Sequence, residues 1–107
     1  MALQHLTAAD FDAAVDAAPA AVVDFWAEWC GPCRALGPVV EKLAGDYEGR
    51  ALIGKVDVDT ETELARRYRV MSIPTVVFLK NGEEFDRKIG LMEESEYAAV
   101  LDKALGE

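Results

Sequence analysis

The stretch Trp26-Ala-Glu-Trp29-Cys30-Gly-Pro-Cys33 decides how this chain of 107 residues folds. It overlaps the end of residues 21–27, a short apolar run rich in Val and Phe that is typical of a buried strand. Beyond it, apolar residues recur at the spacing of one helix face: Leu36, Val39, Val40, Leu43 and Tyr47. Pro32 suits the first turn of that helix, because a missing N–H costs nothing there. The two cysteines are therefore predicted to lie where a strand ends and a helix begins.

The chain after this helix predicts three more strands. Residues 51–58 and 75–80 are apolar runs, and residues 85–89 are the predicted antiparallel partner of 75–80. Between the last two lies Asn81-Gly82, the dipeptide preferred in two-residue hairpin turns.

Capping patterns and periodicity predict three further helices. Thr7 can cap a first helix, which Pro19 ends. The sequence Thr60-Glu-Thr-Glu63 is a capping-box pattern for a short helix, and residues 93–105 have the apolar spacing of a last one. The predicted order is α-β-α-β-α-β-β-α, with room for a short strand before the first helix.

This order predicts an α/β fold with a central mixed sheet. Its first half requires parallel pairing through a right-handed crossover, and its second half is a hairpin. Helices on both faces of the sheet satisfy both requirements. The length suits one domain, and no linker or repeat interrupts the chain, so residues 1–107 are predicted to form a single domain.

Composition narrows the classes of partner. Hydrophobic residues make up 51% and charged residues 29% of the chain, as in globular proteins. The net charge of −9 argues against nucleic acid and anionic membranes as partners, since both require a basic face. No apolar run approaches the roughly 18 residues of a transmembrane helix. The first residues have neither the basic nor the apolar region of a signal peptide, so we expect a cytoplasmic protein.

The two cysteines, Cys30 and Cys33, are predicted to be reactive rather than structural. A bridge across two residues closes a very small loop and removes little entropy from the unfolded chain. A helix N-terminus stabilises a thiolate, which predicts a low pKa for an exposed Cys30. Cys33 lies one turn further in, where the helix shields it, and it can resolve a mixed disulfide formed by Cys30.

Two alternatives to redox chemistry are a zinc half-site and a coincidental pair. Structural zinc sites take four ligands, mostly Cys and His, and the only histidine is His5, far away in sequence. A metal shared between two copies would require a dimer. We therefore expect no metal and favour the redox interpretation.

The quoted stretch resembles the active-site motif of the thioredoxin family. Asp24-Phe25 before it, Ser72-Ile73-Pro74-Thr75 and Lys80-Asn-Gly82 resemble thioredoxin segments in the same order. The resemblance covers essentially the whole chain and is weakest over the first twenty residues. It implies the thioredoxin fold, a central mixed sheet with helices on both faces.

The resemblance implies catalytic roles for two charged residues besides the cysteines. Asp24 lies within an apolar strand and is implied to be a buried acid that moves a proton to and from Cys33. An exposed strand aspartate is the alternative, which the flanking Val22, Val23 and Phe25 disfavour. Lys55 matches a lysine near that acid. Without this match, Lys55 would be interpreted as a surface lysine with a partly buried stem.

The resemblance also implies a substrate-binding surface around the cysteines. Ile73 and Pro74 are implied to present backbone to an extended substrate through a cis peptide bond, although a proline that merely opens a strand is an equal alternative. Trp29 is expected to form an apolar rim, whereas Trp26 is assigned to the core. The other implied substrate-binding residues are Gly31 and Pro32, which keep the turn tight, and Gly90, where a side chain would block backbone approach.

The implied function is a protein-disulfide reductase that works as a monomer. The chain lacks the length and the G-x-G-x-x-G pattern for a flavin or nicotinamide domain, so we expect no bound cofactor and a separate thioredoxin reductase. The alternatives are an oxidase or isomerase of the same fold and a binding module without redox turnover. The choice among disulfide-containing protein substrates is expected to depend on the bulk of Leu91 and Met92 and on the acidic charge of the chain.

Overall fold

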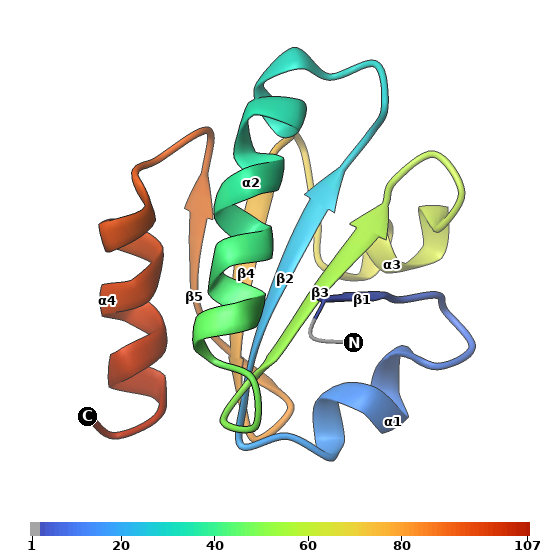
Figure 1. Cartoon of the computed structure of the whole chain (residues 1–107). Helices are drawn as coiled ribbons and strands as arrows, with labels where there is room; N and C mark the ends of the chain where they lie inside the picture. Colours follow the sequence, from blue (N-terminus) through green and yellow to red (C-terminus); the bar gives the residue numbers. More distant parts are fainter. Residues whose placement is uncertain (1–2) are drawn as a thin grey trace.

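The five-stranded sheet is mixed and has the strand order β1-β3-β2-β4-β5 (Figure 1). The computed structural model describes residues 3–107. Along the chain, the elements are β1 (Leu3–His5), α1 (Phe11–Asp16), β2 (Ala20–Trp26), α2 (Gly31–Asp46), β3 (Leu52–Asp57), α3 (Thr62–Arg67), β4 (Thr75–Lys80), β5 (Glu83–Ile89) and α4 (Glu94–Ala104). Strands β1 and β2 run parallel to β3, whereas β4 is antiparallel to both β2 and β5. The predicted mixed sheet is confirmed.

Helices cover both faces of the sheet, as predicted (Figure 1). On one face, α2 and α4 pack on alternate residues of the strands in a cluster that includes Val22, Leu36, Phe78 and Leu101. On the other face, α1 and α3 pack on the remaining strand residues. Because side chains alternate along a strand, the three central strands β2, β3 and β4 each contribute to both clusters.

Strand β2 lies at the centre of the sheet, between β3 and β4, and its residues Ala20–Phe25 are all buried. Val22 belongs to the α2 and α4 side, and alternation places Asp24 on the same face. The strand therefore carries one carboxyl group into the apolar layer beneath α2, close to the point where the chain leaves the sheet.

The two predicted caps are wrong. At α1, which begins at Phe11, the N-cap is Asp10, and Thr7 instead donates its backbone N–H to Asp10 Oδ1 (2.7 Å). At α3 the N-cap is Glu61, and the Thr60 hydroxyl donates to the Asp57 carbonyl oxygen (3.4 Å). In both places a tight turn precedes the helix and takes up the threonine's hydrogen bonds, so the helix starts later than the capping pattern predicts.

The predicted hairpin turn is confirmed. Asn81 and Gly82 both have positive φ, 52° and 83°, as a two-residue turn of this type requires. Strand β5 begins at Glu83, two residues earlier than predicted. A bulge opposite Phe78 and Leu79 lies inside this strand and interrupts its alternating pattern, which explains why the sequence does not mark the earlier start.

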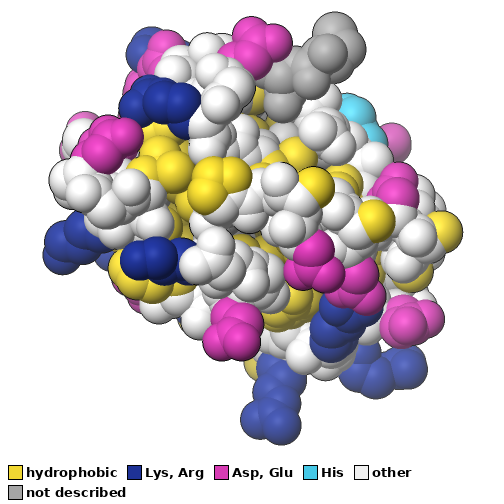
Figure 2. Space-filling model, turned by 90° about the horizontal axis from the view of Figure 1, so that it is seen from below, with side chains coloured by type: hydrophobic (Ala, Val, Ile, Leu, Met, Phe, Trp, Pro, Cys, Tyr) yellow, Lys and Arg dark blue, Asp and Glu magenta, His cyan; other side chains and the backbone are white. Residues whose placement is uncertain are grey.

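The surface mixes charges of both signs. On the face of the molecule seen in Figure 2, basic side chains lie between acidic ones instead of gathering in one patch. Within residues 3–107, no helix has the length and apolar character to cross a membrane.

Gly54 of β3 leads to a prediction about the sheet. A Cβ at Gly54 would lie 2.6 Å from Leu6 Cδ1, and Leu6 is itself buried, so Gly54→Ala has to displace a packed side chain. We expect a loss of about 1–3 kcal/mol in the free energy of unfolding, measured by urea denaturation. Gly45→Ala is the control, since Gly45 lies in α2 with open space around it, and it should gain about 0.5–1 kcal/mol. Equal effects of the two substitutions would contradict this account of the packing.

Candidate active site

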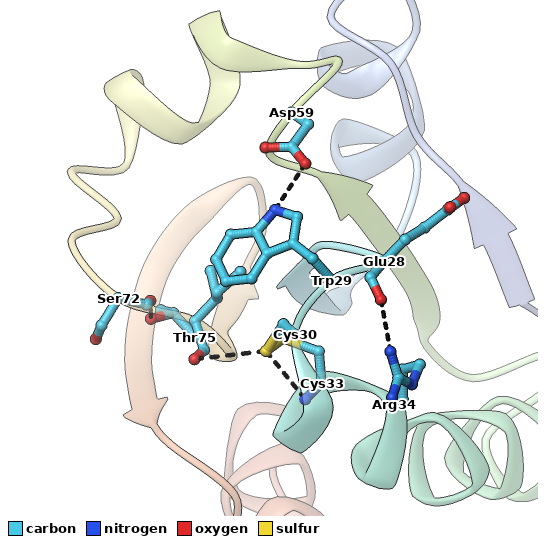
Figure 3. Close-up of a disulfide and its surroundings, with 9 residues drawn as sticks. Glu28, Trp29, Cys30, Cys33, Arg34, Asp59, Ser72 and Thr75 are labelled. Carbon is cyan, nitrogen blue, oxygen red and sulfur yellow. Dashed lines mark hydrogen bonds between the residues drawn. A yellow bond between two sulfur atoms is a disulfide. The ribbon is translucent and has the colours of Figure 1, made fainter.

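Cys30 and Cys33 form a disulfide at the start of α2 (Figure 3). Strand β2 ends at Trp26, and a turn closed by a hydrogen bond from the Cys30 N–H to the Ala27 carbonyl oxygen (3.2 Å) leads into the helix. Cys30 is the N-cap of α2, and its Sγ accepts the backbone N–H of Cys33 (3.2 Å). The predicted position at a strand-to-helix junction is confirmed, and Gly31 and Pro32 lie between the cysteines in the first turn.

Cys30 is less exposed than the sequence predicts. In the disulfide form it is 5% exposed and Cys33 is 1% exposed. Ala27 is buried with both cysteines, and Trp26, Val58 and Ile73 pack around them. The order of exposure agrees with the prediction, but neighbouring apolar side chains cover most of the outer cysteine as well.

The loop before β4 faces the disulfide. The Ile73–Pro74 peptide bond is cis, as the resemblance implies, and Pro74 is buried. The Ile73 carbonyl oxygen lies 3.9 Å from the Sγ of Cys30, and the Thr75 hydroxyl holds the loop by donating to the Ser72 carbonyl oxygen (2.6 Å). Backbone of this loop is thereby brought next to the outer sulfur.

Trp29 projects from the turn before α2 and is 69% exposed. Its indole Nε1–H donates to Asp59 Oδ2 (2.9 Å), which fixes the ring against the end of β3 (Figure 3). With this orientation Trp29 lines an apolar pocket of about 380 Å³, together with Val58, Ala65, Val70, Met71, Ser72 and Ile73. The rim predicted at Trp29 is therefore one wall of a defined pocket.

Sequence reasoning missed several residues of this pocket. Met71 lies two positions before Ile73 and is 93% exposed. The sequence alone does not indicate that this large apolar side chain is exposed. Asp59 lies in the turn after β3, two residues beyond its end, and resembles an ordinary polar turn residue in the sequence. The contact between Asp59 and Trp29 spans 30 positions, so no local pattern could indicate it.

Asp24 is fully buried, which agrees with the interpretation of this residue as a buried acid. Neither of its carboxyl oxygens has a hydrogen-bond partner among the described residues. Burial disfavours the charged form and raises the pKa of Asp24 from 3.8 to about 7, while the positive charge of Lys55 acts in the opposite direction. A carboxyl group with this pKa can both take up and release a proton near neutral pH.

Lys55 lies beside Asp24 in the register of β3 and β2. Its ammonium group sits over the ring of Trp26, with Nζ 4.1 Å from the ring centroid. The side chain is half-buried, as the alternative of a surface lysine with a partly buried stem also predicts.

Gly90 directly follows β5 and is bonded to the loop that carries the cis peptide. Its N–H donates to the Pro74 carbonyl oxygen (2.8 Å), and its own carbonyl oxygen accepts the Tyr97 hydroxyl (3.2 Å). A Cβ there would meet nothing within 4 Å, but φ is +92°, so backbone conformation rather than lack of space favours glycine. The neighbouring Leu91 is exposed.

The described residues hold no group of three or more His, Cys, Asp or Glu side chains that could bind a metal ion. His5 lies in β1 at the edge of the sheet and accordingly does not join the cysteines in a site.

A pair of cysteines that closes a small disulfide at a helix N-terminus is suited to one kind of chemistry, exchange between thiols and disulfides. The fold and this site define the class of the protein as a thiol–disulfide oxidoreductase.

Comparison with known proteins leads to the same class. The Thioredoxin family model matches residues 2–103. A thioredoxin of Staphylococcus epidermidis is 48% identical over 105 residues, 98% of this chain and 100% of that protein. A thioredoxin of Staphylococcus aureus is 49% identical over the same shares. The structure of a mutant thioredoxin from Halobacterium salinarum NRC-1 superposes with a TM-score of 0.89 at 32% identity, over 96% of this chain and 90% of that one. The chain belongs to the thioredoxin family.

Burial of Asp24 predicts how stability depends on pH. Well below the unfolded pKa of 3.8, the folded and unfolded chains both hold the proton, so ionisation costs nothing. Between pH 4 and the folded pKa of about 7, only the unfolded chain ionises, and the free energy of unfolding falls as pH rises. Asp24→Asn removes this loss and should be more stable than the parent at pH 8 by on the order of 1–4 kcal/mol.

The measurement is the difference between urea unfolding curves of the two proteins from pH 4 to pH 8. The difference should grow through this window, because only the parent loses stability there. A difference that is constant with pH would mean that Asp24 does not titrate with a raised pKa.

Proposed function

We propose that this protein reduces disulfides in other proteins by using Cys30 as the nucleophile. The Cys30 thiolate attacks one sulfur of the substrate disulfide, forming a Cys30–substrate disulfide and releasing the other substrate sulfur as a thiolate. The observation that carries this assignment is the hydrogen bond from the Cys33 N–H to the Cys30 Sγ (3.2 Å) at the N-terminus of α2. A donor and a helix dipole aimed at that sulfur favour its thiolate form.

The second step is resolution by Cys33. Its thiolate attacks the Sγ of Cys30, so that the substrate leaves as a thiolate and the Cys30–Cys33 disulfide forms. Cys33 must lose a proton first, and we assign the acceptor role to Asp24, which is buried on the α2 side of β2 and has a pKa of about 7. Lys55 is included in the catalytic set through its charge, which lies near this carboxyl group.

Substrate binding is assigned to the surface around the outer sulfur. An extended peptide can pair with the backbone at Ile73, next to the buried Pro74. Gly31 and Pro32, which are exposed in the first turn of α2, are assigned to the same surface. Trp29 and the apolar pocket beside it receive a side chain of the peptide. Gly90 is assigned to the same surface, because its N–H is bonded to the Pro74 carbonyl oxygen.

Regeneration requires a second protein. The thioredoxin family acts with thioredoxin reductase and disulfide substrates, and we assign the re-reduction of the Cys30–Cys33 disulfide to such a reductase. We further propose that the protein works as a cytoplasmic monomer without a bound cofactor. The acidic net charge of −9 favours partners with neutral or basic surfaces around the target disulfide.

The reduction potential of the Cys30–Cys33 pair separates the reductase from the oxidase or isomerase alternative. Equilibration with a glutathione or dihydrolipoamide buffer should give a strongly reducing potential. An oxidising value would favour the oxidase or isomerase. Replacing both cysteines with serine tests the binding-module alternative, because a binding module would retain its function without them.

The two cysteines should react differently in the reduced protein. We expect iodoacetamide to modify Cys30 much faster than Cys33, because Cys30 is the outer residue and its sulfur caps α2. Cys33→Ser should accumulate mixed disulfides with substrate, while Cys30→Ser should not. Mass spectrometry of the trapped species gives the answer, and trapping by Cys30→Ser instead would reverse the assignment.

Asp24→Asn should slow reduction without abolishing it. The amide keeps the size of the side chain but cannot take the proton of Cys33, while attack by Cys30 does not depend on it. We expect turnover with a protein disulfide to fall by about 10- to 100-fold at pH 7. The rate of the first attack, measured by rapid mixing in the Cys33→Ser background, should change little. Full activity of Asp24→Asn would exclude Asp24 as the proton acceptor.

A further inference from the structure

Three side chains of functional interest share one face of the sheet. Alternation along β2 puts Asp24 and Trp26 on the side of Val22, which packs under α2 and α4. Along β3, Lys55 follows Ile53 of the same cluster by two positions and therefore points to the same side. Asp24 and Lys55 are direct neighbours in the register of the two strands.

Given this arrangement, an ion pair between Lys55 and Asp24 would be expected, but it is not formed. Both oxygens of Asp24 lack a partner among the described residues. The Lys55 ammonium instead stands 4.1 Å from the centroid of the Trp26 ring. A lysine on the face of a tryptophan is held by the negative potential of the ring, and tryptophan offers the strongest such contact.

The group that the Lys55 ammonium contacts affects the transfer of the Cys33 proton to Asp24. A directly paired ammonium strongly favours the ionised form of a carboxyl group, which would then release its proton early and be a poor acceptor near neutral pH. An ammonium held at the ring acts on the carboxyl only through space, and burial prevails. We propose that Trp26 is a positioning residue, whose ring holds the Lys55 ammonium off Asp24 and so leaves this carboxyl free to accept the proton of Cys33.

This inference rests on the proposed role of Asp24. Few titratable groups besides Lys55 face the Asp24 carboxyl group. Lys55 lies beside Asp24 on β3, and Tyr97 faces it from α4, where burial raises the Tyr97 pKa and the negative charge of Asp24 adds to the increase. The third titratable group, Cys33, lies in the first turn of α2 on the same face. The Tyr97 hydroxyl is already engaged with Met92 and Gly90. Lys55 is therefore the cation whose placement sets the state of Asp24.

The test is the titration of the Asp24 carboxyl carbon by carbon-13 NMR in the full-length oxidised protein. The signal is assigned by its loss in Asp24→Asn. Trp26→Leu removes the ring and frees Lys55 to pair with Asp24, so the proton dissociation constant of Asp24 should rise at least tenfold. Trp26→Phe keeps an aromatic face and should give a smaller increase. No change in Trp26→Leu would overturn the inference.

The same substitution in a Lys55→Met background separates positioning from simple loosening of the core. If Trp26 acts through Lys55, Trp26→Leu should no longer raise the dissociation constant once Lys55 is absent. An equal rise with and without Lys55 would mean that water entering the gap is responsible, and Trp26 would not be a positioning residue. Should Trp26→Leu fail to fold, the comparison is made with Trp26→Phe.

A second measurement uses the parent protein alone. The NMR signals of the Lys55 Hε protons must show the upfield shift that the face of an aromatic ring produces, and unshifted signals would also refute the contact.

Because the NMR titration involves neither cysteine, it is independent of the proposed function. Turnover at pH 7 is measured on the same variants. A shifted titration with unchanged kcat would refute the proton-acceptor role of Asp24 and leave the positioning by Trp26 intact. A shifted titration with lowered kcat and unchanged KM would support both.

Discussion

The hydrogen bond from the Cys33 N–H to the Cys30 Sγ joins the fold to the chemistry. It makes the outer sulfur the N-cap of α2, so the helix begins where the disulfide is. That position follows from β2, which is buried between β3 and β4 and ends four residues earlier at Trp26. The register of the central strand thus determines where the sulfur lies and which dipole points at it. A shift of one residue in β2 would turn Asp24 to the other face and separate it from the helix that carries Cys33.

The second constraint is the burial of Asp24 without a hydrogen-bond partner among the described residues. Such a group opposes folding whenever it is charged, and the apolar clusters on both faces of the sheet have to offset it. The same burial gives the carboxyl a pKa near 7, which a surface aspartate does not have. The feature that costs stability is therefore the one that suits the residue for proton transfer, and a substitution that stabilises the fold here is expected to impair turnover.

Much of the fold could be predicted because its signals are local. The apolar run of β2, the helical spacing after Cys33 and the turn at Asn81 each involve neighbours in sequence, and all three lie where they were predicted. Predictions failed where the local structure depends on a contact with a residue distant in sequence, or on a hydrogen bond that competes with the predicted one. Thr60 bonds to the end of β3 instead of capping α3, and Cys30 is covered by Val58 and Ile73 from other parts of the chain. The pocket beside Trp29 depends on a contact with Asp59 that no periodicity could indicate.

The pair of Asp24 and Lys55 shows why a family resemblance leaves the chemistry partly open. Resemblance and strand register place both residues correctly, side by side on adjacent strands. Neither determines whether the ammonium pairs with the carboxyl or rests on a ring, because both arrangements fit the same backbone. An ion pair with a buried carboxylate has to offset the cost of removing both charges from water, whereas the contact with the tryptophan ring is favourable without burying a second charge, so the neighbouring side chain decides between the two arrangements. The structure shows the Lys55 ammonium on the ring of Trp26, and in our proposal a tryptophan that the sequence assigns to the core thereby influences the charge of Asp24.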